Sequence, residues 1–593
     1  MAERFAHVAV IGVGAVGSLW VGLLARHGLR VTAVEADEDR LERARARVAG
    51  LGSRTADGDG PDGAGDRGPA DGGAVRWTTR PADAADADLV IEAVPERAAA
   101  KAEVLGAAVA ACGADTVFAT TTTGYAVARL ASLIGAPTRT VGLHLFPSGP
   151  AGAVEVAGTP LTDAPVREAV LALAGGLGLA PVAVHDRPGF VGGALTLAYL
   201  NSAVTMYEQG YASRDDIDTA MRLGCGLPSG PLAHLDAIGL DVARDTLQAL
   251  YERTGERDYA PAPLLSHYVA AGLLGRKSGR GFYDYQDGRR DAGPAAGAAG
   301  QPGAGLPRRP VGAVGVVGSG TMGAGIAEVC ARAGLTTVLV ARTEARAKEA
   351  LGAVERSLSR GVKRGRLTAE DREAALARLT GAAQPEALGG SDLVIEAVAE
   401  DLGVKRELFA RLGAVCRPGA VLATSTSSLP VVECATASGR PGDVVGLHFF
   451  NPAPVMRLVE VVRTALTSDD AVGTAYAAAR ALGKSPVGCF DRAGFIVNAL
   501  LFPYLNRAVG LVGGQSVAAD DVDAVMVRGL GYPMGPLALL DVVGLDVSLQ
   551  IQRTLHDTFR EPSLAPAPSL EHLVAAGHLG RKTGRGFRVH AAR

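Results

Sequence analysis

The sequence predicts an α/β domain built on a parallel sheet, followed by an all-helical domain, with this pair of domains present twice in tandem. Three observations lead to this fold class. The chain repeats itself, each copy opens with a glycine-rich loop between an apolar strand and a helix, and each copy ends in helical periodicity. The length of 593 residues suits about four domains of roughly 150 residues each.

The internal repeat is visible because short motifs recur at a nearly constant offset of 304 to 306 residues. The paired motifs are Gly12–Gly17 with Gly318–Gly323, Leu89–Val94 with Leu393–Val398, Gly142–His144 with Gly446–His448, Asp186–Phe190 with Asp491–Phe495, Tyr199–Asn201 with Tyr504–Asn506, and Gly275–Phe282 with Gly580–Phe587. An offset this steady indicates duplication of a unit of about 285 residues, which is far too long a period for a solenoid.

The repeat also predicts the domain boundaries. We expect the α/β domains over 1–185 and 311–490, and the helical domains over 186–286 and 491–593. Residues 287–310 are rich in Gly, Ala and Pro and have no periodicity, which is typical of a flexible linker. A second low-complexity stretch runs from about Gly52 to Gly73, where the second copy instead has a charged helical hairpin pattern over about 356–379.

Composition excludes several classes of function. The net charge is −3 and no long basic run is present, so no nucleic-acid partner is expected. Six scattered cysteines form no CxxC pair or His/Cys cluster, which argues against a metal site and a disulfide framework. The apolar stretch Val8–Ala25 contains four glycines and is soon followed by Glu35 and Asp37, which favours a strand–turn–helix over a signal peptide or membrane span. We therefore expect a soluble, cytoplasmic protein without a membrane partner.

Each copy opens with a Gly-x-Gly-x-x-Gly loop between a strand and a helix. The glycines are Gly12, Gly14 and Gly17 in the first copy and Gly318, Gly320 and Gly323 in the second, where Thr321 and Met322 precede the last glycine. In this setting the glycines permit a tight turn and a close backbone approach to a pyrophosphate at the helix N-terminus. One such loop is a weak signal that packing alone could explain, but two at the starts of two repeats predict two Rossmann dinucleotide-binding domains.

The residue after the second strand bears on the choice of nucleotide. An acidic side chain there bonds the adenosine ribose and repels a 2′-phosphate. Glu35 occupies this place in the first copy, whereas Ala341 occupies it in the second and is followed by Arg342. Arg342 is either a phosphate clamp or a solvated loop residue, so the second copy is expected to bind NAD or NADP.

Four polar residues of the second copy stand at the ends of predicted elements: Ser427, His448, Glu460 and Asn498. A histidine titrates near neutral pH and can exchange a proton with a substrate hydroxyl while a hydride goes to a nicotinamide. Glu460 lies in an apolar run and needs a partner, for which His448 is a natural candidate. Ser427 and Asn498 can bond the reacting oxygen. Taken singly, each residue could equally be a core histidine, a strand-edge glutamate or a helix cap.

The motifs around these residues make the second copy resemble the L-3-hydroxyacyl-CoA dehydrogenases over its full length. The motifs are Gly318–Gly323, Thr426–Leu429, Gly446–Pro452, the strand that contains Glu460, Gly494–Asn498, Tyr532–Pro536 and Gly580–Phe587. The resemblance implies a catalytic pair of His448 and Glu460, with Ser427 and Asn498 in the substrate site. It also implies that Glu400 and Lys405 lie near the nicotinamide ribose and that the 356–379 hairpin lies near the CoA phosphates. Ser425 and Ala341 depart from the family, which usually has Asn and an acidic residue there.

The first copy resembles the same family, but its site is altered. His144 remains, Thr123 replaces the serine, and Gly193 stands where the second copy has Asn498. Glu155 aligns with Glu460 across a one-residue gap, and Glu96 and Lys101 are retained. Pro147–Ser148 interrupts the Asn-Pro position. The basic hairpin is replaced by the Gly/Asp-rich stretch. We expect a degenerate first copy with a mainly structural role; a second active site with altered chemistry is the alternative.

The resemblance implies an oxidoreductase that acts in fatty acid metabolism. It would interconvert an (S)-3-hydroxyacyl-CoA, such as 3-hydroxybutyryl-CoA, and a 3-oxoacyl-CoA with NAD(P), with the chemistry in the C-terminal half. The alternatives are a hydroxy-acid dehydrogenase of the same superfamily with a non-CoA substrate, and a non-catalytic NAD(P)-binding protein. The basic run Arg360–Arg366 favours an acyl-CoA substrate. Single-unit relatives pair through their helical domains, so an intramolecular pseudo-dimer of the two halves is also implied.

Overall fold

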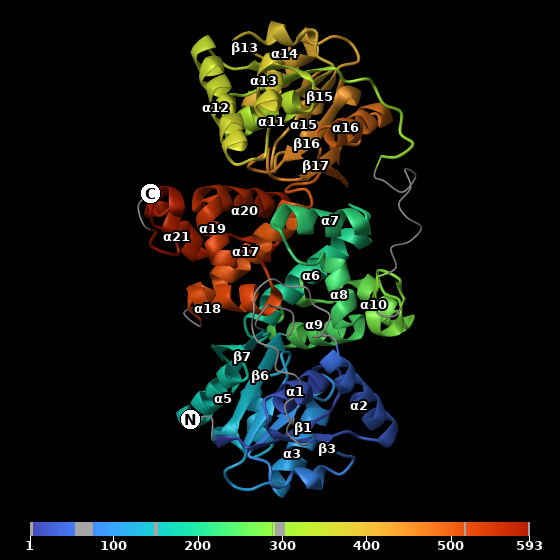
Figure 1. Cartoon of the computed structure of the whole chain (residues 1–593), viewed down its shortest axis with the longest axis vertical. Coiled ribbons are helices and arrows are strands. Elements are labelled where there is room, and N and C mark those ends of the chain that lie inside the picture. Colours follow the sequence, from blue (N-terminus) through green and yellow to red (C-terminus); the bar gives the residue numbers. More distant parts are fainter. Residues whose placement is uncertain are drawn as a thin grey trace.

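The computed structural model describes residues 4–53, 75–146, 152–286, 289–290, 303–514 and 517–590. An α/β domain lies at each end of the molecule, and the two helical domains lie between them (Figure 1). The stretch from Gly52 to Gly73 lies almost wholly outside the described residues, as do most of 287–310 and the Pro147–Ser148 position.

Each α/β domain is built on an eight-stranded sheet, and the two sheets have the same strand order. The first copy contains β1 (His7–Ile11), β2 (Arg30–Val34), β3 (Val75–Thr78), β4 (Leu89–Glu92), β5 (Val117–Thr120), β6 (Thr140–Phe146), β7 (Ala153–Gly158) and β8 (Ala180–His185). The second contains β11 (Ala313–Val317), β12 (Thr336–Val340), β13 (Leu379–Ala382), β14 (Leu393–Glu396), β15 (Val421–Thr424), β16 (Val444–Phe449), β17 (Leu458–Arg463) and β18 (Ser485–Phe490).

The strand order places the glycine loops at the centre of each sheet. In the second copy the order is β13-β12-β11-β14-β15-β16-β17-β18, so the chain reverses its direction of travel between β11 and β14. In open α/β sheets ligands bind at such a switch point, beyond the carboxyl ends of the strands. The Gly318 loop follows β11 and therefore lies at this point.

The sheets are not wholly parallel. All neighbours pair in parallel except β6 with β7 and β16 with β17, which are antiparallel. The expected parallel sheet is therefore confirmed except at this one pair in each copy; in the second copy the connection 450–457 is too short for the crossover that a parallel pair would need.

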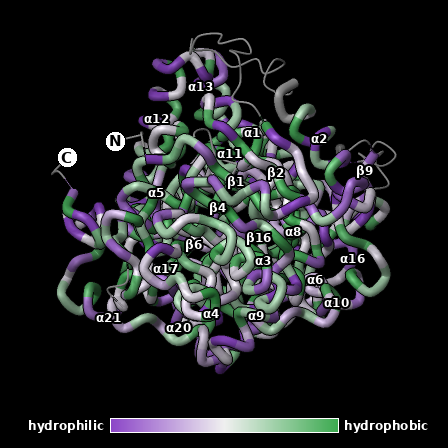
Figure 2. The backbone as a smooth tube through the Cα atoms, turned by 90° about the horizontal axis from the view of Figure 1, so that it is seen from below, coloured by the Kyte–Doolittle hydropathy of each residue, from purple (hydrophilic) through white to green (hydrophobic). Residues whose placement is uncertain are grey.

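The helices of the α/β domains cover the sheets. They are α1 (Ala15–Arg26), α2 (Glu38–Ser53), α3 (Ala98–Ala111), α4 (Val127–Leu133) and α5 (Ala164–Gly176), then α11 (Thr321–Arg332), α12 (Glu344–Lys363), α13 (Ala369–Ala377), α14 (Leu402–Val415), α15 (Val431–Ala437) and α16 (Asp469–Ala481). The expected charged hairpin is formed by the end of α12 and by α13, which begins with a capping box between Thr368 and Asp371. Figure 2 shows α12 and α13 at the edge of the molecule.

The helical domains begin with long buried helices. The first contains α6 (Gly192–Glu208), α7 (Arg214–Cys225), α8 (Pro231–Ile238), α9 (Leu240–Thr254) and α10 (Pro263–Ala270); the second contains α17 (Val497–Gly513), α18 (Ala519–Ala524), the π-helical turn η9 (Val525–Gly529), α19 (Pro536–Val543), α20 (Leu545–Phe559) and α21 (Pro568–Ala575). A small hairpin of β9 (Tyr285–Gln286) and β10 (Arg289–Arg290) follows the first domain. Asp218 and Asp523 each accept two backbone N–H groups at the starts of α8 and α19, which fixes the Gly-Pro turns.

The two helical domains contact each other along α6 and α17. Tyr199 and Tyr504 occupy equivalent positions in the two copies, and their ring centroids lie 6.1 Å apart. Arg507 of α17 reaches across to the first copy, where it forms ion pairs with Glu256 and Asp258 and donates to the Tyr259 hydroxyl at 3.1 Å. The contact therefore combines an apolar centre with a charged rim.

Each helical domain also packs on the sheet of the other copy. Helix α7 of the first copy lies directly against β17 and β18 of the second (Figure 1). Ala212 forms an antiparallel bridge with Cys489, and the Phe490 N–H donates to the Tyr211 carbonyl at 3.3 Å. In turn, η9 of the second copy packs on β7 of the first, and Gly529 of η9 lies against Phe146 at the end of the neighbouring strand β6. The first copy thus completes the edge of the second sheet.

The described part of the expected linker, 303–310, lies against the second α/β domain. Arg309 forms ion pairs with Asp443 and Asp470 at 2.6 and 2.8 Å, and its backbone N–H donates to Thr474. These bonds hold the pKa of Asp470 at about 2, chiefly through its hydrogen bond to Arg309. These last residues of the expected linker are therefore tied to the second α/β domain by hydrogen bonds and ion pairs. Within the described residues no helix is long and apolar enough to cross a membrane.

Candidate active site

His448 and Glu460 face each other across the antiparallel strands β16 and β17. They are direct partners in the strand register. His448 Nδ1 lies 2.6 Å from Glu460 Oε2, and the two residues are 4% and 0% exposed. The hydrogen bond expected from the sequence is therefore present, and it follows from the antiparallel pairing.

Glu460 also connects the sheet to the helical domain. Its Oε1 accepts the backbone N–H groups of Ile496 and Val497 at 3.0 and 2.9 Å. These groups lie in the first turn of α17, where helical N–H groups have no partner within the helix. Glu460 thus holds the Nδ1 side of the imidazole, and Nε2 of His448 makes no hydrogen bond within the described residues.

Ser427 and Asn498 lie together at the same domain boundary. The Asn498 side chain donates from Nδ2 to the Ser427 carbonyl at 3.0 Å, which ties the loop after β15 to the start of α17. Ser427 is half-buried, and its hydroxyl makes no hydrogen bond within the described residues. Ser425, where the sequence departs from the family pattern, accepts the Phe449 N–H at 3.3 Å. The free Ser427 hydroxyl is therefore available to a ligand.

Glu400 and Lys405 belong to a buried ionic network. The Lys405 ammonium lies 2.7 Å from Glu396 Oε1 and 3.4 Å from Glu400 Oε2, and Lys405 is 1% exposed. Glu400 Oε1 accepts the Thr426 hydroxyl at 2.7 Å and the Ser427 N–H at 2.8 Å. Lys405 is therefore buried behind Glu400 and can hold it only through their ion pair. Glu400, whose side chain is 29% exposed, is the member of the network that a ligand can reach.

Sequence reasoning missed Glu396, which is the centre of this network. Its second carboxylate oxygen accepts the Thr424 hydroxyl at 2.7 Å, and its first also accepts the Val398 N–H. The first copy has the same network around Glu92, with Lys101 and Thr120 as partners. The signal was the acidic residue that ends the repeated apolar motif in both copies.

The glycine loops leave room only where a phosphate would approach. A Cβ at Gly318 would lie 2.3 Å from the Ala397 carbonyl oxygen, and one at Gly323 would lie 2.1 Å from the Gly318 carbonyl oxygen. At Gly320 nothing lies within 4 Å. Gly320 begins α11 without any side-chain cap, so the N–H groups of this helix remain available to an anion. Gly12, Gly14 and Gly17 repeat this pattern in the first copy.

The two copies differ after the second strand, as the sequence predicts. The Glu35 carboxylate accepts the Val13 N–H of the glycine loop at 2.8 Å and therefore stands beside that loop. Ala341 is buried, whereas Arg342 is exposed and makes no ion pair within the described residues. Thr321 lines the adjoining cavity, and Met322 packs on the core of the domain.

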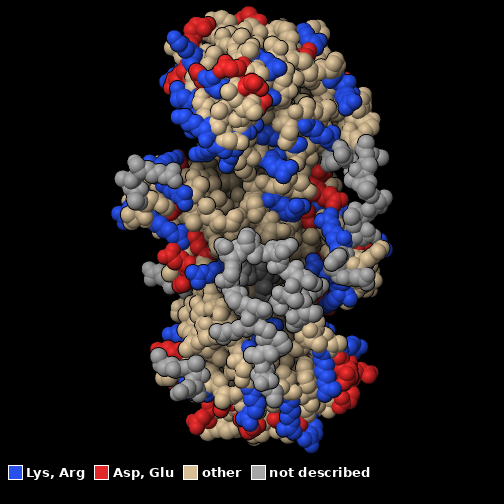
Figure 3. Space-filling model, viewed as in Figure 1, with Lys and Arg blue, Asp and Glu red and all other residues tan. Residues whose placement is uncertain are grey.

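A cavity of about 600 Å³ opens beside the second glycine loop. Arg360, Arg364 and Arg366 from the α12–α13 hairpin line it, together with Thr321 and the segment 451–455 that follows β16. These three arginines are exposed and form no ion pair within the described part of the chain, although Arg360 lies near enough to Glu328, which also lines the cavity, to offset part of the rise that burial causes in its pKa. Figure 3 shows Lys and Arg gathered at this edge of the upper domain, above a hollow. The cavity thus joins the catalytic strand to a cationic rim.

The first copy retains only part of the site. His144 Nδ1 lies 2.9 Å from Glu155 Oε2, and Glu155 accepts the Val191 and Gly192 N–H groups as Glu460 does in the second copy. Gly193 has no side chain to reach the loop, where Thr123 lies 3.8 Å from the position of a Cβ. His144 is also more open, with 23% of its side chain exposed. The first copy therefore keeps the His–Glu pair but has no counterpart of the Asn498 side chain beside it.

Comparison with known families matches this arrangement twice. A family model described as "3-hydroxyacyl-CoA dehydrogenase, NAD binding domain" matches residues 7–187 and 313–492. A second model, for the C-terminal domain of the same enzymes, matches 189–285 and 494–590. The chain belongs to the 3-hydroxyacyl-CoA dehydrogenase family. It contains the complete family unit in tandem.

Individual relatives of this family cover one unit or both. A 3-hydroxybutyryl-CoA dehydrogenase of Mycobacterium tuberculosis is 48% identical over 276 residues, which is 46% of this chain and 96% of that protein. The human mitochondrial hydroxyacyl-coenzyme A dehydrogenase is 43% identical over 281 residues, 46% of this chain and 89% of that protein. The crystal structure of an Escherichia coli 3-hydroxybutyryl-CoA dehydrogenase covers 97% of this chain and 99% of its own, with a TM-score of 0.63 and 23% identity. This last likeness shows a shared fold over the whole tandem.

No group of His, Cys, Asp and Glu suited to hold a metal ion occurs among the described residues. All six cysteines are free.

Proposed function

We propose that the second copy catalyses the NAD(P)-linked interconversion of an (S)-3-hydroxyacyl-CoA, such as 3-hydroxybutyryl-CoA, and a 3-oxoacyl-CoA. The observation that supports it most is the buried His448–Glu460 pair at the carboxyl edge of a sheet that carries a dinucleotide loop. Two relatives that each match 46% of this chain are named as 3-hydroxybutyryl-CoA and hydroxyacyl-coenzyme A dehydrogenases, and these names support the same substrate class.

In this proposal His448 is the acid–base residue. Its Nε2 takes the proton of the 3-hydroxyl group during oxidation and returns it during reduction. A nicotinamide dinucleotide held at the glycine loop would supply the hydride chemistry at carbon 3. Glu460 orients the ring through Nδ1 and stabilises the imidazolium. Ser427 and Asn498 bind the substrate oxygen, and their mutual bond holds the two domains at the reacting centre.

The dinucleotide would be held by residues that fit it. Gly318, Gly320 and Gly323 allow the pyrophosphate to reach the N-terminus of α11, with Thr321 and Met322 in its first turn. Glu400 faces the ribose, and Lys405 keeps Glu400 in place. We include NADP as well as NAD for this copy, because Arg342 is exposed and the carboxylate is missing. Gly12, Gly14, Gly17 and Glu35 would hold NAD in the first copy.

An acyl-CoA substrate is supported by the cationic rim of the large cavity. Arg360, Arg364 and Arg366 present guanidinium groups without ion-pair partners in the described part of the chain, which suit the phosphates of CoA. A non-CoA hydroxy acid would leave these three charges without a role. This is why we prefer the thioester over the alternative hydroxy-acid substrate.

The deciding experiment follows NADH and NADPH oxidation with acetoacetyl-CoA and, separately, with free acetoacetate at the same concentrations. We expect turnover of the thioester and little or none of the free acid. Turnover of the free acid alone would replace this proposal with the non-CoA dehydrogenase. No turnover of either, with nucleotide binding retained, would favour a non-catalytic nucleotide-binding protein.

The proposal extends to the organisation of the chain. We infer that 1–185 and 311–490 act as dinucleotide domains, that 186–286 and 491–593 act as helical domains, and that 287–310 joins the halves. The contacts of α6 with α17 support an intramolecular pseudo-dimer. A cytoplasmic location is part of the same proposal.

A further inference from the structure

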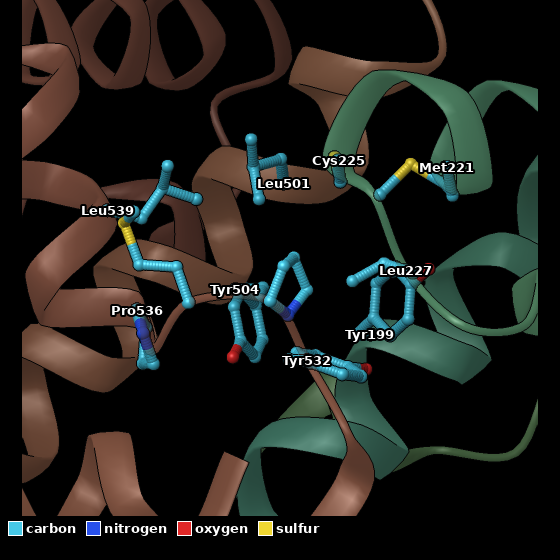
Figure 4. A pocket seen from close by; sticks show the side chains of 11 residues that line it. Tyr199, Met221, Cys225, Leu227, Leu501, Tyr504, Tyr532, Pro536 and Leu539 are labelled. Carbon is cyan, nitrogen blue, oxygen red and sulfur yellow. The ribbon is translucent and has the colours of Figure 1, made fainter. Parts of the chain in front are cut away.

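An apolar cavity of about 210 Å³ lies between the two helical domains (Figure 4). The first copy contributes Tyr199 from α6, Met221 and Cys225 from α7, and Leu227 from the loop that follows. The second copy contributes two residues of α17, the segment 532–536 and Leu539. No Asp, Glu, Lys or Arg lines this cavity, so it suits an uncharged, apolar occupant.

The cavity adjoins the active site of the second copy. Leu501 lines it and lies three residues beyond Asn498 along α17, a rise of about 4.5 Å, and Tyr504 lies three residues further. Successive turns of α17 therefore connect Asn498 to the lining of the cavity.

The first copy reaches the same place from the other side. A Cβ added at Gly224 would lie 2.9 Å from Leu458 Cδ2 and 3.0 Å from Val497 Cγ2, so the end of α7 packs on the catalytic strand and on the start of α17. The next residue is Cys225, and burial together with the nearby Glu460 charge raises the pKa of its thiol to about 12. The helix that supplies this cavity wall thus packs on residues next to Glu460, since Leu458 lies in the same strand and the Val497 N–H donates to Glu460.

We propose that this cavity receives the far end of the substrate's acyl chain, so that the first copy forms one wall of a chain-length subsite for the second. The inference rests on the proposed function. An apolar cavity of about 150 Å³ takes up a benzene molecule, so this larger cavity has room for roughly six to eight chain carbons. A short chain such as acetoacetyl ends before Leu501, whereas a medium-length chain extends beyond it.

The subsite predicts a rising preference with chain length in the unaltered protein. Each methylene buried in the cavity is expected to raise kcat/KM about fourfold, which corresponds to about 0.8 kcal/mol. We would compare acetoacetyl-CoA, 3-oxohexanoyl-CoA, 3-oxooctanoyl-CoA and 3-oxodecanoyl-CoA in the full chain. A kcat/KM that rises to the eight- or ten-carbon chain supports the subsite. A kcat/KM that falls steadily beyond acetoacetyl-CoA would overturn it.

Two variants test the wall contributed by the first copy. Cys225→Met fills the cavity and should lower kcat/KM for 3-oxodecanoyl-CoA at least fivefold, with acetoacetyl-CoA changed less than twofold. Leu227→Ala enlarges the cavity and should shift the preference toward longer chains. Cys112→Met makes the same replacement on the first α/β domain, outside the cavity, and should leave the chain-length profile unchanged.

The outcomes separate this inference from the proposed function. If no 3-oxoacyl-CoA is reduced by the unaltered protein, the proposed function itself fails. If acetoacetyl-CoA is reduced but the ratio between long and short chains is the same in Cys225→Met, Leu227→Ala and Cys112→Met, only the subsite is refuted. Thermal unfolding and NADH binding of each variant report its fold, and the profile of the unaltered protein decides the matter where a variant does not fold.

Discussion

His448 is the residue on which turnover should depend most. His448→Gln keeps a similar volume but removes a group that can exchange a proton near neutral pH. We expect kcat for acetoacetyl-CoA reduction to fall about 100- to 10,000-fold, the usual contribution of a positioned acid–base group. NADH binding and thermal unfolding should stay close to those of the unaltered protein. Near-normal turnover in this variant would refute the assignment.

Glu460→Gln provides the matched test of the same pair. The glutamate accepts His448 on one oxygen and two backbone N–H groups on the other. A glutamine has one acceptor oxygen, so its NH₂ group must face either the imidazole N–H or the backbone donors. We therefore expect this variant to lose turnover and also some stability, about 1 to 3 kcal/mol, whereas His448→Gln loses turnover alone.

Arg342 decides a second question at this scale, which is the choice of nucleotide. After β12 the position of Glu35 is taken by Ala341, and the next residue, Arg342, carries an exposed guanidinium, so a 2′-phosphate would meet attraction in place of repulsion. We expect the second copy to use NADPH at least as well as NADH, and Arg342→Ala to lower kcat/KM for NADPH about tenfold while that for NADH changes little. A strong NADH preference that Arg342→Ala leaves unchanged would contradict this.

Single residues show how far the sequence could predict the site. The pairing of His448 with Glu460 was predictable, because a carboxylate in an apolar strand needs a partner. The network of Glu396 with Lys405 was not, because each of the two is an ordinary residue on its own. They meet only through the turn between β14 and α14, and no local pattern describes that turn.

At the scale of elements, the α12–α13 hairpin distinguishes the second copy from the first. Its exposed Arg360 and Arg364 line the large cavity without ion-pair partners in the described part of the chain. We expect the double variant Arg360→Ala/Arg364→Ala to raise KM for acetoacetyl-CoA about tenfold or more, since two charge-assisted contacts to phosphate are lost, with kcat changed little. The measurement is a steady-state titration of the thioester at saturating nucleotide.

A truncated substrate and a control variant make this test specific. A short acetoacetyl thioester that lacks the nucleotide part of CoA should show the same KM in the unaltered and double-variant proteins. Arg346→Ala/Lys348→Ala removes two exposed positive charges from the other end of α12 and should not change either KM. An equal effect of the two double variants would show that only overall charge matters.

Hydrophobic patterns predict the positions of the strands but not the direction of every strand. The apolar runs 393–397 and 421–423 predict buried strands, and β14 and β15 lie there, because strands covered on both faces are almost continuously apolar. The reversal between β16 and β17 was not predicted, although it is what brings Glu460 opposite His448. Strand direction depends on the length of the connection, and the segment 450–457 is too short for the crossover that a parallel pair needs.

Across the whole molecule, the two halves should contribute unequally to turnover. The first copy keeps His144 and Glu155 but lacks a side chain at Gly193 and has Thr123 in place of the serine. We expect His144→Gln to leave acetoacetyl-CoA reduction nearly unchanged, in contrast to His448→Gln. A fall to half of the original rate or less would show that both sites work.

The halves should nevertheless remain one functional unit, because each packs on the sheet of the other. Helix α7 lies against β17 and β18, and Arg507 bridges to Glu256 and Asp258.

If a site for a specific protease is introduced between 291 and 302, we expect the cut halves to elute together in size-exclusion chromatography and to keep most of their activity. Arg507→Ala removes the ion-pair partner of both Glu256 and Asp258, so the cut halves of this variant should separate more readily. Cut halves that separate at once with full activity in the second half would show that the contact has no role in catalysis. Loss of activity on separation, with the second half still folded, is the result that the packing of α7 behind Glu460 predicts.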